Sequence, residues 1–374
     1  MKIQGKIISA QKKINKAANS AFKRAFLGSI SIDDLAKSSK REHHVYDSFT
    51  EKVTTPEAIT MNFIREAQSL QSSTFTTPNI FTSSLHNVCF SPRYNILYTQ
   101  SRQIIRESIS TQRELTQFDI RTFYQKPVDQ IAGVCATFRS HKNCYYHTLI
   151  DNLPRLYLLH HPRFQKMETV QLLCAGSPTV VEKFYLEQLL PENVKVLQID
   201  QTRPYLLDNL IFPSFLSRRF SGYLPSEYRN WFVQLVGPKR PRNKHHRIFI
   251  SRVPTSKGAL RCIVNEEELY DTLRPYGFKR YVLEQLSIRE QIELFYDAEA
   301  VVATHGAGLT NTLFSAGIKV LELFPIPFVV PHYYFLAKAM GHQYRYLCSD
   351  RTYLSSNFSV NISEISRILE SYMD

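Results

Sequence analysis

The stretch AVVATHGAGLTNTLFSAGIKVLELFP, residues 300–325, decides the fold class of this chain. It predicts a buried strand (Ala300–Thr304), a glycine turn (His305-Gly306-Ala307-Gly308), a short helix from Leu309 and a second buried strand (Lys319–Phe324). A strand that leads through glycines into a helix directs backbone N–H groups and the positive helix end at one spot. That spot suits the phosphates of a nucleotide. The alternative is an ordinary βαβ unit with a tight turn.

Polar side chains of the same stretch suggest individual roles. His305 either contacts a phosphate or packs under the turn, whose glycines let the backbone approach a ligand closely. Thr310 and Asn311 lie in the first helical turn, where they cap the helix or reach a phosphate, and capping is favoured. Glu322 interrupts an apolar strand near its carboxyl end, where ligands of open α/β sheets bind. Its two oxygens suffice for both hydroxyls of a ribose, although an edge carboxylate is the alternative.

Composition favours two globular domains without a membrane-spanning helix. The chain has 374 residues, of which 43% are hydrophobic, and no apolar run approaches the roughly 18 residues that span a bilayer. The N-terminus lacks the apolar centre of a secretory signal. The six cysteines form no CxxC pair, so neither a zinc ribbon nor a redox dithiol is indicated, and we expect reduced, mostly buried thiols. We therefore expect a cytoplasmic protein.

The formal charge of +13 indicates that the protein binds an anionic partner. Nucleic acid, an anionic membrane surface and a phosphorylated substrate are the candidates. Basic residues concentrate in 2–41 and in 238–247. In the first segment isoleucines and phenylalanines alternate with lysines, as in a basic amphipathic helix on anionic headgroups, and a solvated arm is the alternative. No nucleic-acid-binding signature is present, so we expect no nucleic-acid partner.

Two alternations of strand and helix divide the chain. Residues 30–80 are polar and read as an irregular lead-in. The first alternation comprises strands 131–138, 170–175 and 194–199 with helices 144–160, kinked at Pro154, and 180–190. After the proline-rich and basic stretch 237–244, the second comprises strands 246–251, 278–282, 300–304, 319–324 and 344–347 with helices 266–273, 288–296, 332–340 and 362–372. Such alternation indicates Rossmann-like α/β domains.

The resulting division has four parts. A basic N-terminal arm (1–45) precedes an N-terminal α/β domain (46–236), a C-terminal α/β domain that contains the glycine turn (237–350), and a tail with a closing helix (351–374). Two α/β domains with a cleft between them are the expected architecture.

Two further groups of residues carry chemistry. In His147-Thr-Leu-Ile-Asp151 the histidine and the aspartate are four apart on a predicted helix, where they share a face and form a candidate general base; a surface pair or a salt bridge from Asp151 to Arg155 is the alternative. In RIFISR (247–252) the strand ends at Arg252, whose guanidinium can bind a diphosphate. Lys257 and Arg261 follow, and a solvated basic loop is the alternative for both.

Three segments resemble glycosyltransferase family 61, whose bacterial members take part in capsular-polysaccharide biosynthesis. They are YYHTLIDNLPRL (145–156), RIFISR (247–252) and HGAGLTNTLFSAGIKVLELFP (305–325), in matching order and spacing, so the resemblance covers roughly residues 130–350. It implies a GT-B fold with two Rossmann-like domains facing across a cleft. It also implies inverting transfer from a nucleotide sugar, a UDP-sugar, to a glycan, without cofactor or obligatory metal.

Residue by residue, the resemblance implies Asp151 as the catalytic base with His147 beside it, Arg252 as the diphosphate clamp, His305 to Gly308 as the phosphate turn, and Glu322 as the ribose ligand. Thr148 departs from the family, in which an aromatic residue is common after the histidine. Phosphates held by backbone N–H groups and Arg252 receive the stabilisation that magnesium supplies in other transferases.

The lead hypothesis is an inverting, metal-independent glycosyltransferase that acts in the cytoplasm or at the inner face of the membrane. Its acceptor would be a glycan or lipid-linked glycan of a surface polysaccharide. One alternative is another nucleotide-sugar enzyme, such as an epimerase. The other is a non-catalytic nucleotide- or glycan-binding component of a polysaccharide assembly complex.

Overall fold

The computed structural model describes most of the chain and omits Lys257 and the arm up to residue 27. The described residues are 28–35, 50–54, 58–60, 74–109, 125, 127, 129–140, 144–217, 222–252, 261–326, 328–349, 351–353 and 357–372. The fold is mixed α/β and separates into two compact units. The first comprises Met1–Pro56, Pro78–Asn143 and Asp151–Arg219, and the second comprises Glu57–Thr77, Cys144–Ile150 and Phe220–Asp374.

The first unit is built on a nine-stranded sheet with the order β1-β7-β6-β5-β11-β8-β9-β10, in which β2 also pairs with β5. Its strands are β1 (Ser29–Ile30), β2 (Thr50–Thr54), β5 (Ile80–Ser91), β6 (Ile96–Tyr98), β7 (Ile104–Ile105), β8 (Asp129–Thr137), β9 (Val170–Ala175), β10 (Val194–Ile199) and β11 (Tyr205–Pro213). The strands β11, β8, β9 and β10 are parallel, and β5 runs antiparallel to β11.

Helices connect the parallel strands of the first unit. They are η3 (a π-helical segment, Thr148–Asn152), α5 (Pro154–Tyr157), η4 (Leu158–His160), α6 (Pro162–Gln165) and α7 (Val180–Leu189), with the 3₁₀ turn η1 (Arg106–Ser108) near the other edge. The predicted succession of strand, helix, strand, helix and strand is confirmed by β8, β9 and β10. The core contains Val88, Phe90, Leu173, Leu207 and Phe212, contributed by both halves of the sheet.

The expectation of an irregular lead-in over 30–80 is wrong. Strand β2 extends the sheet by pairing with β5, β1 pairs with β7, and β3 (Ala58–Thr60) pairs with β4 (Thr74–Thr76) in a separate ribbon of the second unit. These strands are two to five residues long and rich in Thr. Strands so short lack the repeated alternation on which a sequence prediction depends.

The second unit contains a five-stranded parallel sheet with the order β13-β12-β14-β15-β16. Its strands are β12 (His246–Ile250), β13 (Phe278–Tyr281), β14 (Ala298–Thr304), β15 (Lys319–Phe324) and β16 (Gln343–Cys348), with a small ribbon of β17 (Arg351–Thr352) and β18 (Phe358–Ser359). Its helices are α4 (Tyr145–His147), α8 (Ser226–Val236), α9 (Glu266–Leu273), α10 (Ile288–Tyr296), α11 (His332–Met340) and α12 (Ile362–Tyr372), with 3₁₀ segments η5 (Arg274–Tyr276), η6 (Leu283–Gln285) and η7 (Ala307–Phe314).

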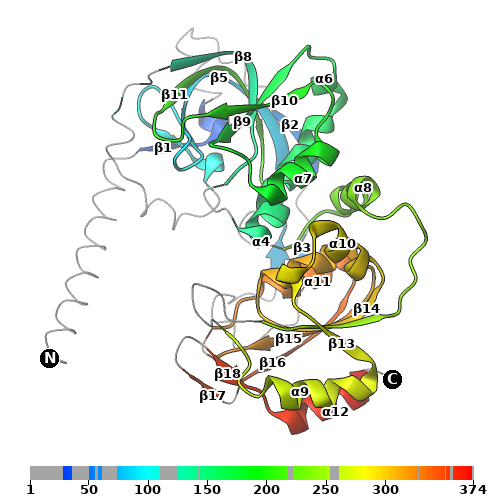
Figure 1. Cartoon of the computed structure of the whole chain (residues 1–374). Helices are drawn as coiled ribbons and strands as arrows, with labels where there is room; N and C mark the ends of the chain where they lie inside the picture. The colour runs from blue at the N-terminus through cyan, green and yellow to red at the C-terminus, as the bar shows by residue number, and fades with distance from the viewer. Residues whose placement is uncertain are drawn as a thin grey trace, which may run out of the picture. The chain divides into compact units, whose positions relative to one another are not determined.

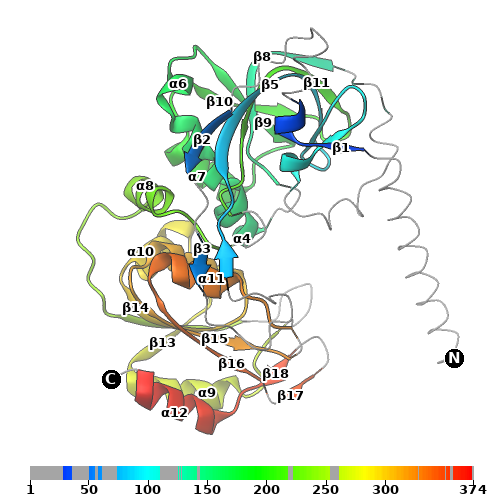
Figure 2. The same cartoon turned by 180° about the vertical axis from the view of Figure 1, so that it is seen from behind.

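Helices cover both faces of this sheet. Figures 1 and 2 show α9 and α12 side by side on one face and α10 and α11 on the other. Phe249, Val302 and Leu321 lie in the core shared with Leu269 of α9 and Ile365 of α12. The second predicted alternation is therefore confirmed element by element. The linker candidate 237–244 connects α8, which sequence reasoning missed, to β12 within the second unit.

Two predicted helices differ in form. The helix over 144–160 is broken into α4, the π-helical η3, α5 and η4, and α5 restarts at Pro154 as its proline predicts. The helix expected from Leu309 is the 3₁₀ segment η7, which begins at Ala307. The Oγ1 atom of Thr312 donates to the carbonyl of Leu309 at 2.8 Å, so a side chain competes there for a backbone acceptor.

Candidate functional site

Two strand ends meet at a switch point in the sheet of the second unit. The chain passes from β12 to β13 on one side and then returns to β14 on the other side of β12. Ligands of open α/β sheets bind outside the carboxyl ends of the strands at such a point. Arg252 follows the end of β12, and His305 follows the end of β14. The fold thus brings together two residues that were predicted from separate motifs.

The guanidinium of Arg252 packs over the glycine turn. A Cβ atom at Gly306 would lie 3.1 Å from both Cζ and one terminal nitrogen of Arg252, closer than side chains normally approach. Gly308 has another neighbour, because a Cβ there would lie 2.8 Å from Cδ1 of Leu283. The turn therefore combines a cation with closely approaching backbone, an arrangement that suits an anionic ligand.

Arg261 supplies a second cation beside Arg252. Its guanidinium lies 5.7 Å from the ring centre of Phe328, and its backbone takes the left-handed conformation with φ of 59°. Burial and the nearby charge of Arg252 lower the pKa of Arg261. Two like charges held together repel each other, and an anion bound between them would relieve that repulsion. Sequence analysis named Arg261 together with Lys257 as a basic residue after Arg252, with a solvated loop as the alternative, and the structure places it within electrostatic reach of Arg252.

His305 is buried beneath the turn and fixed by an acid. Its Nδ1 atom lies 2.5 Å from Oε1 of Glu322, and Tyr344 donates from its hydroxyl to Oε2 of Glu322 at 2.5 Å. The ring stacks on Phe324, with centroids 5.2 Å apart. Glu322 is 0% exposed. His305 and Glu322, which were both predicted to bind the sugar donor, are thus hydrogen-bonded to each other. Tyr344, which the sequence did not predict, is hydrogen-bonded to the same glutamate.

Thr310 and Asn311 are fully buried and bonded to protein groups. Thr310 lies 3.3 Å from the hydroxyl of Tyr333, and Asn311 accepts from Tyr145 at 2.5 Å and donates to Gln291 at 2.9 Å. The expectation that they cap the helix is wrong, because η7 begins after Gly306 and has no side-chain cap. Their contacts tie η7 to α4, α10 and α11.

Helix α4 contains the first residues of the motif 145–156 and belongs to the second unit. Tyr145 bonds to Asn311, and the ring of Tyr146 stacks on His332 of α11 with centroids 5.3 Å apart. Tyr146 also contacts the rings of His147 and Tyr333 edge-on, at 5.2 and 5.5 Å. His332 in turn lies 6.3 Å from the ring of His305. A continuous group of rings therefore connects the first motif with the glycine turn.

Asp151 belongs to the other unit. The boundary between the units falls after Ile150, so His147 lies in the second unit and Asp151 in the first. Asp151 is 7% exposed and lies within η3. A π-helical segment bonds residues five apart instead of four and occurs frequently at functional sites. Its neighbour Asn152 accepts from the backbone N–H of Ser140 at 2.7 Å, which anchors the segment to the end of β8.

Arg155 does not serve as the salt-bridge partner considered for Asp151. Its guanidinium is fully buried and donates to the carbonyls of Pro213 and Arg139 and to Oγ1 of Thr137, at 2.8, 3.2 and 3.3 Å. Burial lowers the pKa of Arg155 to about 9, still above neutral pH. This residue joins the carboxyl ends of β8 and β11 beneath the segment that carries Asp151.

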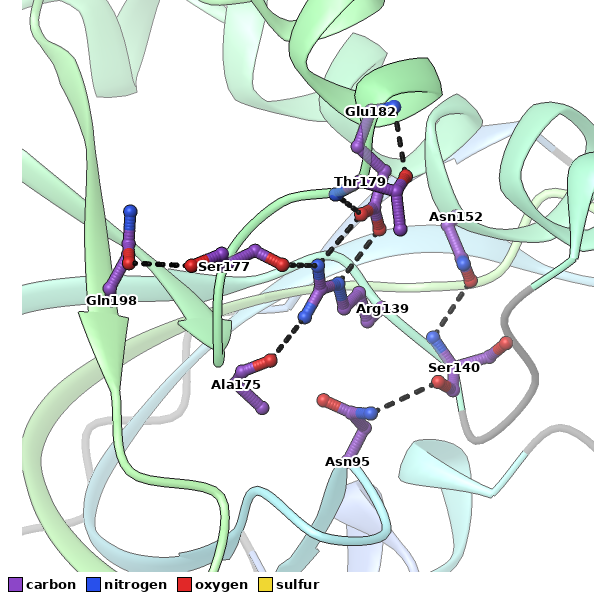
Figure 3. Close-up of polar contacts among 9 residues, drawn as sticks. All are labelled: Asn95, Arg139, Ser140, Asn152, Ala175, Ser177, Thr179, Glu182 and Gln198. Carbon is purple, nitrogen blue, oxygen red and sulfur yellow. Dashed lines mark hydrogen bonds and ion pairs between the residues drawn. The ribbon is translucent and has the colours of Figure 1, made fainter.

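An ion pair fixes the neighbouring strand ends of the first unit (Figure 3). Arg139 donates to both oxygens of Glu182 at 2.8 and 2.7 Å and to the carbonyls of Ala175 and Ser177. Glu182 also accepts from the backbone of Thr179 in a capping box that begins α7. The pair therefore connects the ends of β8 and β9 to the N-terminus of α7. Its charged groups are hydrogen-bonded to each other.

Other sequence predictions stay open. Lys257 lies outside the described residues. Within the described ranges, no group of three or more His, Cys, Asp or Glu is arranged to hold a metal ion. No helix in the described part of the chain has the length and apolarity needed to cross a bilayer. The six cysteines, all of them among the described residues, form no disulfide bond in the structure.

Residues 145–320 match the model of the family described as Glycosyltransferase 61. This chain carries a glycosyltransferase 61 domain. The domain begins at α4 and includes Asp151, Arg252 and the glycine turn, whereas Glu322 follows just beyond it.

A beta-1,2-xylosyltransferase of Arabidopsis thaliana is 26% identical to this chain over 96 residues. That alignment covers 22% of this chain and 18% of the plant protein, so the chain spans less than a fifth of that curated relative.

Proposed function

We propose that this chain is an inverting, metal-independent glycosyltransferase that transfers a sugar from a nucleotide donor, a UDP-sugar, to a glycan. The observation that carries the proposal is the packing of the Arg252 guanidinium over the glycine turn at the switch point of a parallel sheet. The glycosyltransferase 61 domain and the likeness to a plant xylosyltransferase support a hexosyl or pentosyl transfer.

The donor diphosphate binds at the carboxyl ends of β12 and β14. Arg252 and Arg261 contact its oxygens from one side, and His305 with the backbone from Gly306 to Gly308 contacts them from the other. Lys257, which lies between the two arginines in the sequence, adds a third cation. Thr310 and Asn311 hold the turn in place through their contacts with Tyr333, Tyr145 and Gln291. These charges stabilise the diphosphate as it leaves.

Asp151 acts as the general base, and His147 lies beside it in the sequence motif. The carboxylate takes the proton of an acceptor hydroxyl, whose oxygen forms a bond to the anomeric carbon. The bond from that carbon to the diphosphate breaks on the opposite face, which inverts the configuration. Because base and donor residues lie in different units, the GT-B arrangement with two facing Rossmann-like domains is part of this proposal.

The biological setting completes the proposal. The acceptor is a glycan or lipid-linked glycan in the synthesis of a capsular, exo- or lipopolysaccharide. The protein works in the cytoplasm, at the inner face of the membrane, with the basic segment 2–41 on anionic headgroups.

A ligand panel followed by turnover tests the activity. Thermal shifts with UDP, GDP, CMP and their sugar conjugates identify the donor, and turnover is then measured with that conjugate. We expect Arg252→Ala to weaken donor binding at least about tenfold. Arg274→Ala, which removes a 68% exposed cation of the same unit, should leave binding unchanged and is the matched control. Equal losses in both variants would contradict the assigned clamp.

Replacing the base separates transfer from binding. Asp151→Asn should lower kcat by about 10³-fold while donor affinity stays within about twofold of the wild type. Unchanged turnover would remove Asp151 from the mechanism. Release of an epimer without any acceptor would favour the epimerase alternative, and donor binding without turnover of any acceptor would favour the binding component.

A further inference from the structure

The environment of Glu322 differs from that of a ribose ligand. Leu321 and Leu323 point to the core with α9 and α12, so by alternation Glu322 points to the opposite face of the sheet. It is 0% exposed, and each of its oxygens already has a partner, Nδ1 of His305 at 2.5 Å and the hydroxyl of Tyr344 at 2.5 Å. Because Glu322 is fully buried, a ribose hydroxyl could reach it only if the surrounding groups moved.

The direction of both hydrogen bonds follows from Tyr344. Burial and the adjacent Glu322 carboxylate raise the pKa of Tyr344 well above its usual 10. The phenol therefore keeps its proton and donates it to Oε2. A buried carboxylate is stabilised when both of its oxygens accept hydrogen bonds. Oε1 therefore accepts as well, which places a proton on Nδ1 of His305.

This arrangement leaves Nε2 of His305 for a ligand. Directions from the two ring nitrogens diverge, so Nε2 points away from Glu322. No other described residue hydrogen-bonds to the ring, which is 6% exposed and lies directly before the glycine turn. A buried imidazole with one nitrogen fixed and the other unbonded is prepared for a partner that arrives from outside the protein.

We propose that Glu322, whose other oxygen is held by Tyr344, is the positioning residue for His305, which presents Nε2 to a phosphate oxygen of the donor. The inference rests on the proposed function for the identity of that anion. The ring then bridges the two anions: Nδ1 donates to the Glu322 carboxylate, and a proton shared between Nε2 and the phosphate oxygen makes the other hydrogen bond. As the diphosphate leaves and gains charge, the Nε2–H hydrogen bond strengthens. Glu322 thus acts through His305 and makes no contact with the ribose.

The ring nitrogens of His305 test this arrangement without any ligand. In the protein labelled with ¹⁵N-histidine, the signals of His305 among the 12 histidines are assigned by their loss in His305→Gln. Nitrogen shifts distinguish a proton on Nδ1 from one on Nε2. We expect a protonated Nδ1 in the wild type and in Tyr344→Phe. In Glu322→Leu, which keeps the volume but removes the acceptor, we expect Nε2–H to predominate.

Matched variants keep the test decisive. Glu299→Gln breaks a carboxylate pair with Arg247 in the same sheet and should leave the ring signals of His305 unchanged. Glu322→Gln is the second variant if Glu322→Leu fails to fold, and it should weaken the Nδ1–H signal. A ring pattern that is identical in the wild type and in the folded Glu322 variants would overturn the proposal.

Nucleotide binding then separates positioning from ribose recognition. UDP and 2′-deoxy-UDP are titrated by calorimetry into the wild type and Glu322→Gln. For a positioning residue, the ratio of the two dissociation constants is the same in both proteins within about twofold. For a ribose ligand, the wild type prefers UDP at least about tenfold and Glu322→Gln loses that preference, which would overturn our assignment. If the wild type binds neither nucleotide, the UDP donor is wrong, while the ring spectrum still decides the role of Glu322.

Discussion

Gly306 and Gly308 belong to one turn but serve different neighbours. The missing side chain of Gly306 makes room for the guanidinium of Arg252, and that of Gly308 makes room for Leu283. Gly306 has an extended backbone with φ of 176°, which alanine also adopts. We therefore expect a substitution at Gly306 to affect ligand binding and a substitution at Gly308 to affect stability.

Gly306→Ala should raise the dissociation constant for the donor nucleotide about tenfold, because its methyl group displaces the guanidinium. Stability should change by less than about 1 kcal/mol, since the end of a long side chain can move. Gly308→Ala, the matched comparison, should lower the free energy of unfolding by about 1–3 kcal/mol through contact with Leu283. Calorimetric titration and denaturant unfolding measure both effects. The reverse pattern would contradict the assignment.

His342 makes the second unit sensitive to pH. Its Nε2 lies 3.1 Å from the carbonyl of Thr312 and its Nδ1 accepts from Ile318 at 3.3 Å, so the neutral ring joins η7 to β15. Burial, followed by the nearby charges of Arg229, Lys244 and Arg242, lowers the pKa of His342 from 6.5 to about 4.

Stability should therefore fall as the pH drops from about 6.5 to about 4, because the unfolded chain takes up a proton that the folded ring refuses. The lowered pKa of His342 accounts for a loss of about 3 kcal/mol in the free energy of unfolding over this range. His342→Gln, whose amide can bond to the same two groups, should remove that part of the slope. Denaturant unfolding across this range measures it. A slope that is the same in both proteins would contradict the prediction.

Sequence reasoning located residues that follow strand ends, whereas it could not show contacts between residues far apart in the chain. Arg252 and the glycine turn follow strand ends that periodicity locates. Tyr344 lies beside Glu322 because of strand pairing, and Arg261, a left-handed residue, lies near Arg252. No linear pattern shows that both oxygens of Glu322 have hydrogen-bond partners, which is the observation behind the role we propose for it.

At the scale of elements, strands and helices with strong periodicity were predictable. Helices α9, α10, α11 and α12 begin and end as predicted, because each combines an apolar stripe with clear boundaries. The missed elements have other origins. The long strand β5 has polar residues in partly buried positions, and β11 contains Asp208 and Asn209 where a core strand would be apolar. A polar side chain of β11 nevertheless has a hydrogen-bond partner, since Asn209 is hydrogen-bonded to His86 of β5.

The Arg139–Glu182 pair should behave as a coupled unit. Removing one member leaves the other charge buried without its partner, so Arg139→Met or Glu182→Met should each cost about 3–5 kcal/mol of stability. The double variant should cost clearly less than the sum, because no charge is then stranded. A double-mutant cycle by denaturant unfolding measures the coupling. Additive losses would show that the carbonyls of Ala175 and Ser177 matter more than the ion pair.

At the scale of the whole molecule, the formal charge of +13 predicts attraction to anionic surfaces. The basic segment 2–41 should bring the protein to vesicles that contain phosphatidylserine, and rising salt should weaken this binding. Removing residues 1–28 should abolish sedimentation with these vesicles and leave nucleotide affinity unchanged. Vesicles of phosphatidylcholine alone are the control. Equal sedimentation of the full-length and shortened chains would assign the segment another role.

The discontinuous second unit constrains how the chain folds during synthesis. The last residue of the first unit is Arg219, so all of that unit has been made long before translation ends. Tyr145 of α4, by contrast, bonds to Asn311, 166 residues later. At typical rates of about 5–20 residues per second, α4 waits roughly 8–30 s for this partner. During that interval its aromatic side chains lack their native contacts, which makes this short motif the segment that nascent-chain chaperones have most reason to protect.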